Sequence, residues 1–120
     1  MRRVLVVDDD MVCRELIREA LHGDDLEVLE AAHGEQALEI IEQYRPDLVL
    51  LDIQMPNATG YAVLEQIRSD PRLASLRVAA LTAYAMRGDR EKGLSAGFDD
   101  YITKPIEVSI LRLRVQRLLA

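Results

Sequence analysis

Acids, a hydroxyl and a lysine end or follow four short apolar runs in this 120-residue chain. Asp8 and Asp9 follow the first run, Asp52 ends another, and Thr82 and Lys104 mark two later ones. Such runs are typical of strands buried on both faces of a parallel sheet, whose carboxyl ends bind ligands at one edge. We therefore expect these side chains to meet at a single site.

Three carboxylates at one site need compensation, because two like charges about 4 Å apart repel by roughly 4 kcal/mol at an effective dielectric of about 20. An oxygen-only site with open positions suits Mg²⁺, with Mn²⁺ as a substitute, and Mg²⁺ often contacts a substrate phosphate. With Lys104 as a positive arm and Thr82 as a donor, the site could hold a transferring phosphoryl group. One carboxylate would be the nucleophile and would form an acyl phosphate.

Each of these acids also has a plainer interpretation. Asp8, Asp9 and Asp10 could form an N-cap cluster, which the dipole of a following helix would favour. Asp52 could be an ordinary turn residue at a strand end. The expected convergence with Thr82 favours the chemical site over both of these alternatives.

Hydrophobic periodicity predicts an α/β domain in which strands and helices alternate. Strands are expected at 4–7, 27–31, 48–52, 78–82 and 101–103, and helices at 11–21, 34–44, 61–68, 86–96 and 107–119. In the last helix, Val108, Leu111, Val115 and Leu118 form the predicted inward stripe. Right-handed crossovers make the sheet parallel, with helices on both faces.

Composition limits the class of protein. The formal net charge of −6 argues against direct binding of nucleic acid, which rewards clustered Lys and Arg. The single cysteine, Cys13, is expected in the core and fits a reducing compartment. There is no apolar run near the length of a membrane span and no signal peptide, so a cytoplasmic location is expected. We expect one domain over residues 1–120, with no output domain in this chain.

Four segments taken together resemble the receiver domain of two-component response regulators. They are Val4-Leu5-Val6-Val7-Asp8-Asp9, Leu51-Asp52-Ile53-Gln54-Met55-Pro56, Ala80-Leu81-Thr82-Ala83 and Tyr101-Ile102-Thr103-Lys104-Pro105-Ile106. The resemblance implies a three-layer αβα, flavodoxin-like (βα)5 fold with strand order 2-1-3-4-5. It also implies that Asp52 accepts a phosphoryl group from a phosphohistidine of a histidine kinase or histidine phosphotransfer protein, in phosphorelay signal transduction.

The resemblance also assigns a Mg²⁺ site. Asp9 would bind the ion directly and Asp8 through water, while Asp52 and the main-chain carbonyl of Gln54 would complete the protein ligands.

Further residues take switch roles by the same resemblance. Lys104 would pair with the phosphate, Thr82 would turn its hydroxyl toward it, and Tyr101 would swing inward behind Thr82. The Lys104–Pro105 peptide bond would be cis. Tyr84 is bulky enough to shield the site, which favours a longer-lived phosphoryl group.

Ile110 and Leu113 lie opposite the core stripe of the last helix, so they are either scattered exposed residues or a docking surface. Receivers commonly signal through this face, either as monomers or as phosphorylation-linked homodimers through the fourth helix, fifth strand and fifth helix. The partner there would be a downstream protein target. Charged residues at 87 and 89–92 are interpreted as a solvated helix face.

Three rival functions remain open. An FMN binder would need a Ser/Thr-rich phosphate loop, whereas Asp8, Asp9 and Asp10 repel phosphate unless a cation intervenes. A haloacid-dehalogenase-like phosphatase normally carries a general acid two residues after its nucleophile, where this chain has Gln54. A pseudo-receiver would bind partners without phosphorylation. A receiver would catalyse only its own phosphorylation and dephosphorylation, alone or within a hybrid histidine kinase.

Overall fold

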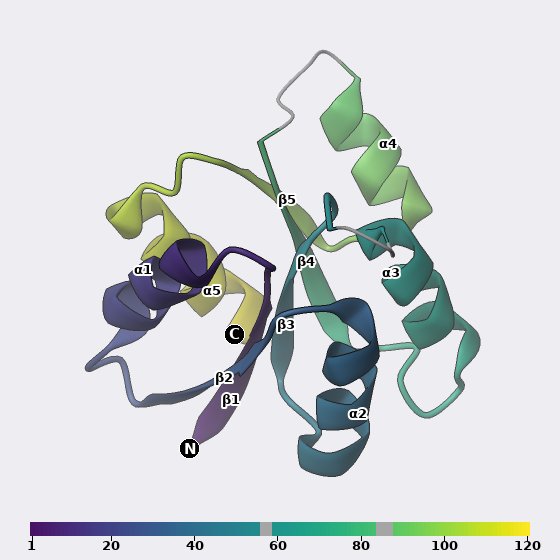
Figure 1. The fold of residues 1–120 in the computed structure, drawn as a ribbon, viewed down its shortest axis with the longest axis horizontal. Coiled ribbons are helices and arrows are strands. Elements are labelled where there is room, and N and C mark those ends of the chain that lie inside the picture. The colour runs from purple at the N-terminus through teal and green to yellow at the C-terminus, as the bar shows by residue number, and fades with distance from the viewer. Residues whose placement is uncertain (56–58, 84–87) are drawn as a thin grey trace.

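The computed structural model describes residues 1–55, 59–83 and 88–120, in which strands and helices alternate (Figure 1). The elements in chain order are β1 (Arg2–Val7), α1 (Met11–Leu21), β2 (Leu26–Ala31), α2 (Gly34–Tyr44), β3 (Leu48–Asp52), α3 (Gly60–Ser69), β4 (Arg77–Thr82), α4 (Asp89–Ala96), β5 (Asp100–Thr103) and α5 (Val108–Leu119). The alternation predicted from periodicity is confirmed, with most ends within one residue, the usual uncertainty of helix and strand boundaries.

The five strands form one parallel sheet in the order β2-β1-β3-β4-β5, the order expected of a flavodoxin-like fold. Its register brings the strand ends together. Val7 of β1 pairs with Leu51 of β3, so the aspartates that follow these two residues are neighbours. Thr82 and Thr103 are also partners across β4 and β5, so Lys104 leaves the sheet beside Thr82.

Helices cover both faces of the sheet, and two apolar cores fill the spaces between the layers. One core lies between the sheet and helices α1 and α5, and it includes Ile17, Leu50 and Leu111. The other lies under α2 and α3 and includes Ile41 and Leu64. Figure 1 shows α1 and α5 on one side of the sheet and α2, α3 and α4 on the other. This confirms the three-layer αβα prediction.

Two details of the helix predictions are wrong. Helix α4 begins at Asp89 rather than near position 86, because Gly88 has a left-handed backbone (φ 92°) and occupies the N-cap. Val108 was expected in the core but is 41% exposed, since it is the first residue of α5, and only Leu111 and Val115 of this stripe are fully buried. None of the helices in 1–55, 59–83 or 88–120 has both the length and the apolar character needed to span a bilayer.

Candidate functional site

The carboxylate of Asp8 is fully buried at the end of β1, within a tightly hydrogen-bonded turn. Its main-chain N–H donates to the carbonyl of Ala31 at 3.1 Å, and its Oδ1 accepts from the N–H of Asp10 at 2.9 Å. Asp10 in turn caps α1, where its side chain accepts from the N–H of Val12. The N-cap interpretation therefore holds for Asp10, whereas Asp8 points toward the other acids.

Asp52 occupies the equivalent place at the end of β3 and is only 3% exposed. Its Oδ1 accepts from the main-chain N–H of Gln54 at 2.9 Å. The N–H of Ile53 donates to the carbonyl of Leu81 at 3.1 Å, which ties this turn to β4. Asp52 is therefore presented from a rigid strand end and not from a free loop.

Lys104 joins the two strand ends. Its Nζ lies 2.8 Å from Oδ2 of Asp8 and 3.5 Å from Oδ2 of Asp52. The main-chain N–H of Lys104 donates to the carbonyl of Thr82 at 2.7 Å, so the lysine is anchored beside β4. Its peptide bond to Pro105 is cis.

The acids fit a divalent cation. Carboxylate oxygens of Asp8, Asp9 and Asp52 lie within 4.8 Å of one another, with Asp9 exposed and the other two buried. Oδ2 of Asp8 is buried and receives no hydrogen bond of good geometry from the described residues, even though the ammonium of Lys104 is close enough for an ion pair. A buried carboxylate oxygen with unused acceptor capacity is what a hard, oxygen-seeking ion requires.

Burial and mutual repulsion affect the two buried acids differently. Burial, together with the negative charge of Asp8, raises the pKa of Asp52 to about 6. Burial also opposes ionisation of Asp8, but contacts with Lys104, Asp10 and Cys13 outweigh it, so the pKa of Asp8 is lowered. The Asp8 contact likewise outweighs burial at Lys104 and raises the pKa of its ammonium group. Lys104 therefore stays charged, and of the two buried acids Asp52 is the one that takes up a proton more readily.

Thr82 and Tyr101 lie behind the acids, and both side chains are buried. Burial raises the pKa of Tyr101, and a hydrogen bond with Thr82 offsets only part of that effect. The ring of Tyr101 packs so closely on α4 that a Cβ at Gly93 would lie 2.7 Å from it. The hydroxyl and the aromatic ring named from the sequence are thus adjacent. Tyr84 lies outside the described residues.

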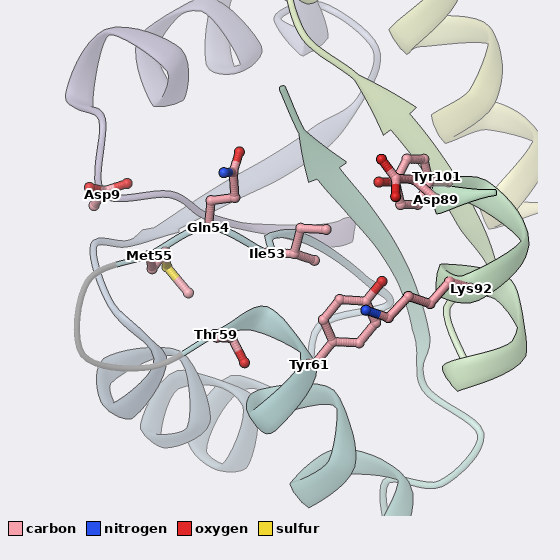
Figure 2. Close-up of a pocket in the computed structure, with 9 residues that line it drawn as sticks. All are labelled: Asp9, Ile53, Gln54, Met55, Thr59, Tyr61, Asp89, Lys92 and Tyr101. Carbon is pink, nitrogen blue, oxygen red and sulfur yellow. The ribbon is translucent and has the colours of Figure 1, made fainter. Parts of the chain in front are cut away.

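A cavity of about 640 Å³ adjoins the acids between α3 and α4 (Figure 2). Its lining residues are Asp9, Ile53, Gln54, Met55, Thr59, Tyr61, Asp89, Lys92 and Tyr101. Lys92 reaches from α4 over the ring of Tyr61, with its Nζ 5.5 Å from the ring centroid. Sequence reasoning missed Tyr61 and took Lys92 for part of a solvated helix face. No signal within either helix indicates this cavity, because it depends on how α3 and α4 are placed relative to each other.

Ile110 and Leu113 lie away from the acids on the outer face of α5, where they are 46% and 55% exposed. Cys13 is buried beside Asp8 in the core, as predicted. Burial and the neighbouring Asp8 carboxylate raise the pKa of its thiol to about 12, so it stays neutral.

The fold and this arrangement of acids and lysine define a class of protein, and comparison with known proteins identifies the family. A family model for the response regulator receiver domain matches residues 4–116. The chain therefore belongs to the response regulator receiver domain family, whose members act in two-component signalling.

Individual relatives agree with this assignment. The polar-differentiation response regulator DivK of Brucella anthropi is 36% identical over 89% of this chain and 87% of its own length. RpaA of Synechocystis sp., named as a DNA-binding dual master transcriptional regulator, is 35% identical over 99% of this chain but only 49% of its own length. The crystal structure of a response regulator from Chloroflexus aurantiacus superposes with a TM-score of 0.92 at 35% identity, covering 98% of this chain and 97% of that one.

Proposed function

We propose that Asp52 accepts a phosphoryl group from a phosphohistidine of a histidine kinase or histidine phosphotransfer protein. In this step an Asp52 carboxylate oxygen forms the new O–P bond as the donor N–P bond breaks, and the departing imidazole, which carries a proton on its other ring nitrogen, leaves as a neutral histidine. The observation that carries the proposal is the contact of one ammonium group with two buried carboxylates, 2.8 Å from Asp8 and 3.5 Å from Asp52. With a pKa of about 6, Asp52 is mostly ionised, and hence nucleophilic, at neutral pH.

Mg²⁺, or Mn²⁺ in its place, is the cofactor of this proposal. Asp8, Asp9 and Asp52 would hold it, together with the main-chain carbonyl of Gln54. When bound, the ion neutralises charge on the phosphoryl oxygens and on the clustered acids. The unused acceptor capacity of buried Oδ2 of Asp8 supports this assignment.

Lys104 and Thr82 supply the response to phosphorylation. The lysine ammonium would pair with the phosphoryl oxygens, and the Thr82 hydroxyl would move toward them, with Tyr101 following inward. Phosphorylation adds a charge of about −1.5 to −2. A complete switch needs roughly 5.5 kcal/mol of preference for one state. The direct contact of Tyr101 with α4 at Gly93 supports a route from the site to the outer surface.

The outer surface of α5 is the proposed docking site for a downstream protein target or for a second copy of the chain through α4, β5 and α5. Ile110 and Leu113 are the exposed apolar residues that support it. The double variant Ile110→Glu with Leu113→Glu, studied by light scattering and by partner binding after phosphorylation, tests this surface. Unchanged assembly and unchanged binding would remove it from the proposal.

Residues 1–120 would act as a single receiver domain in the cytoplasm, without direct contact with nucleic acid or membrane. Such a domain catalyses only its own phosphorylation and dephosphorylation, so it is not a turnover enzyme.

The deciding experiment is incubation with acetyl phosphate and Mg²⁺, followed by intact mass measurement. The wild-type chain should gain one phosphoryl group, and neither Asp52→Asn nor wild type in EDTA should gain any. A chain that binds Mg²⁺ but is never phosphorylated would instead be a pseudo-receiver. Release of free phosphate from many outside substrates, with Asp52 as nucleophile, would indicate a phosphatase.

A further inference from the structure

Arg14 of α1 contacts the main chain of the acid site. Its Nη1 donates to the main-chain carbonyl of Asp8 at 2.6 Å, while its Nε donates to Oε1 of Glu30 on β2 at 3.1 Å. Its side chain is only 15% exposed, so these bonds form largely out of water. Arg14 therefore links the start of α1, the end of β1 and the edge strand through a single guanidinium.

Glu30 keeps that guanidinium in place. The same carboxylate accepts from Arg18, one turn further along α1, with Oε2 at 2.9 Å from Nε and 2.5 Å from Nη2. Burial alone would raise the pKa of Glu30, but the hydrogen bonds from Arg18 and Arg14 outweigh it, so the pKa of Glu30 is lowered. Glu30 thus stays ionised and presents a fixed acceptor to both arginines.

The Asp8 turn is held at three points. Its N–H is bonded to Ala31, its Oδ1 to Asp10, and its carbonyl to Arg14. The first two bonds fix the strand end and the side-chain rotamer. The third fixes the peptide plane between Asp8 and Asp9, and the orientation of that plane sets where the exposed Asp9 carboxylate begins.

We propose that Arg14 is a positioning residue for the divalent cation, because it holds the peptide that joins the two acids of the β1 end. The inference rests on the cation site of the proposed function. Partners behind metal ligands commonly change metal affinity by about 10- to 100-fold when they are removed. Arg14 touches neither the ion nor the phosphoryl group in this proposal, and Glu30 orients its guanidinium.

Charge and positioning predict opposite results when Arg14 is replaced. A nearby positive charge disfavours a bound cation, so its removal should tighten Mg²⁺ binding if Arg14 acts only through its field. Loss of the hydrogen bond to the Asp8 carbonyl should weaken Mg²⁺ binding if Arg14 acts through position. The direction of the change in affinity therefore separates the two roles.

The test is isothermal titration of Mg²⁺ into the full chain, combined with urea unfolding in EDTA. Arg14→Gln should raise the dissociation constant about 10-fold. Arg14→Lys, which can satisfy only one of the two acceptors, should give a smaller rise. Arg18→Gln is the matched control, since Arg18 shares the Glu30 carboxylate but donates to the Val28 carbonyl and not to Asp8. It should lose stability while its Mg²⁺ affinity stays unchanged.

Equal affinity of Arg14→Gln and wild type, or tighter binding by the variant, would overturn the positioning role. So would an equal loss of affinity in Arg18→Gln, because that would be a general effect of a weakened α1–β2 contact. If Arg14→Gln does not fold, the comparison of Arg14→Lys with Arg18→Gln decides the question. Absence of Mg²⁺ binding by wild type would overturn the proposed function itself and Arg14's role with it.

Discussion

The ends of β1 and β3 are built as the same turn, yet they give their aspartates different properties. In each turn, Oδ1 accepts from the main-chain N–H two residues further on at 2.9 Å. In each, Oδ2 faces the ammonium of Lys104, but at 2.8 Å from Asp8 and 3.5 Å from Asp52. The pKa of Asp8 is nevertheless lowered, whereas that of Asp52 is raised to about 6.

The surroundings of each turn account for this difference. At Asp8, burial is outweighed by the closer lysine and by hydrogen bonds with Asp10 and Cys13. At Asp52, burial prevails and the like charge of Asp8 adds to it. Helix α3 also returns to the backbone of this turn at Gly60. An identical local turn can therefore present either an acid that stays ionised as a ligand or an acid with a more basic carboxylate. The higher basicity favours Asp52 as the nucleophile.

The largest expected effect comes from Gly60, which lets α3 begin against the β3 end. A Cβ at this position would lie 2.7 Å from the carbonyl oxygen of Asp52 and 2.7 Å from Cα of Ile53. Both are backbone atoms that cannot move without shifting the strand end. We expect Gly60→Ala to lower the free energy of unfolding by about 3 kcal/mol, the upper range for overpacking. Urea unfolding monitored by circular dichroism measures it.

The β1 end supplies the control for that prediction. Helix α1 begins at Met11, which is 59% exposed. Met11→Ala should change the free energy of unfolding by less than about 0.5 kcal/mol, as is usual for surface substitutions. A Gly60→Ala variant as stable as wild type would show that the backbone of the β3 end can yield, and the contrast between the two turns would be weaker.

For the next effect, Asp52→Asn and Asp8→Asn should change the free energy of unfolding in opposite directions when measured in EDTA. The pKa of Asp52 rises from 3.8 to about 6 on folding, so the ionised form opposes folding above pH 6. Asp52→Asn should therefore stabilise the metal-free chain by about 2 to 3 kcal/mol at pH 8. Asp8 has a lowered pKa, so its ionised form favours folding above its ordinary value of 3.8. Asp8→Asn should destabilise the chain by about 1 to 3 kcal/mol at pH 8.

Unfolding curves from pH 8 down to pH 4 measure both variants against wild type. The gain from Asp52→Asn should be full above pH 6 and should fade between pH 6 and about 4, as wild-type Asp52 takes up its proton. The loss from Asp8→Asn should persist to a lower pH. The two acids would prove equivalent if both substitutions shifted stability in the same direction.

The sequence predicts those features of this structure that neighbouring residues determine, and it misses those that depend on tertiary packing. The apolar runs before Asp8 and Asp52 identify buried strands, and parallel pairing then brings the two acids together. Val108 was misplaced because periodicity specifies a helix face but not how far the sheet extends beneath it. Tyr61 and Lys92 were missed as cavity residues because their meeting depends on the relative placement of two helices.

The partners of arginine side chains were equally hidden. The helical pattern of α1 contains Arg14 and Arg18, one turn apart, and both were available to pair with any nearby acid. Arg14 donates to the Asp8 carbonyl and Arg18 donates to the Val28 carbonyl. This division follows from the packing of α1 on β2. Long, flexible side chains take their partners from tertiary structure, so sequence spacing alone does not assign them.

The smallest effect concerns Lys104, the group shared by both turns. Its ammonium group neutralises the same carboxylates that a divalent cation would neutralise. Lys104→Met removes one positive charge from the cluster, so Mg²⁺ should bind about tenfold more tightly, roughly 1.4 kcal/mol, a part of the ~4 kcal/mol expected for two full charges about 4 Å apart. Isothermal titration measures the change in affinity. Salt screens exposed ion pairs most strongly, and Lys104 and the two acids are largely buried, so the change should shrink only modestly as salt is raised.

Lys92→Met is the matched control, because Lys92 is the only other lysine in the chain and lines the cavity that adjoins the acids. Its Nζ lies over Tyr61 and not between the acids, so its loss should leave Mg²⁺ affinity nearly unchanged. Equal tightening in both variants would mean that net charge alone governs the site. Weaker binding in Lys104→Met would mean that the lysine holds the acids in place for the ion, as proposed for Arg14. The opposite signs expected for Lys104→Met and Arg14→Gln thus separate a competing charge from a positioning contact at the same acid.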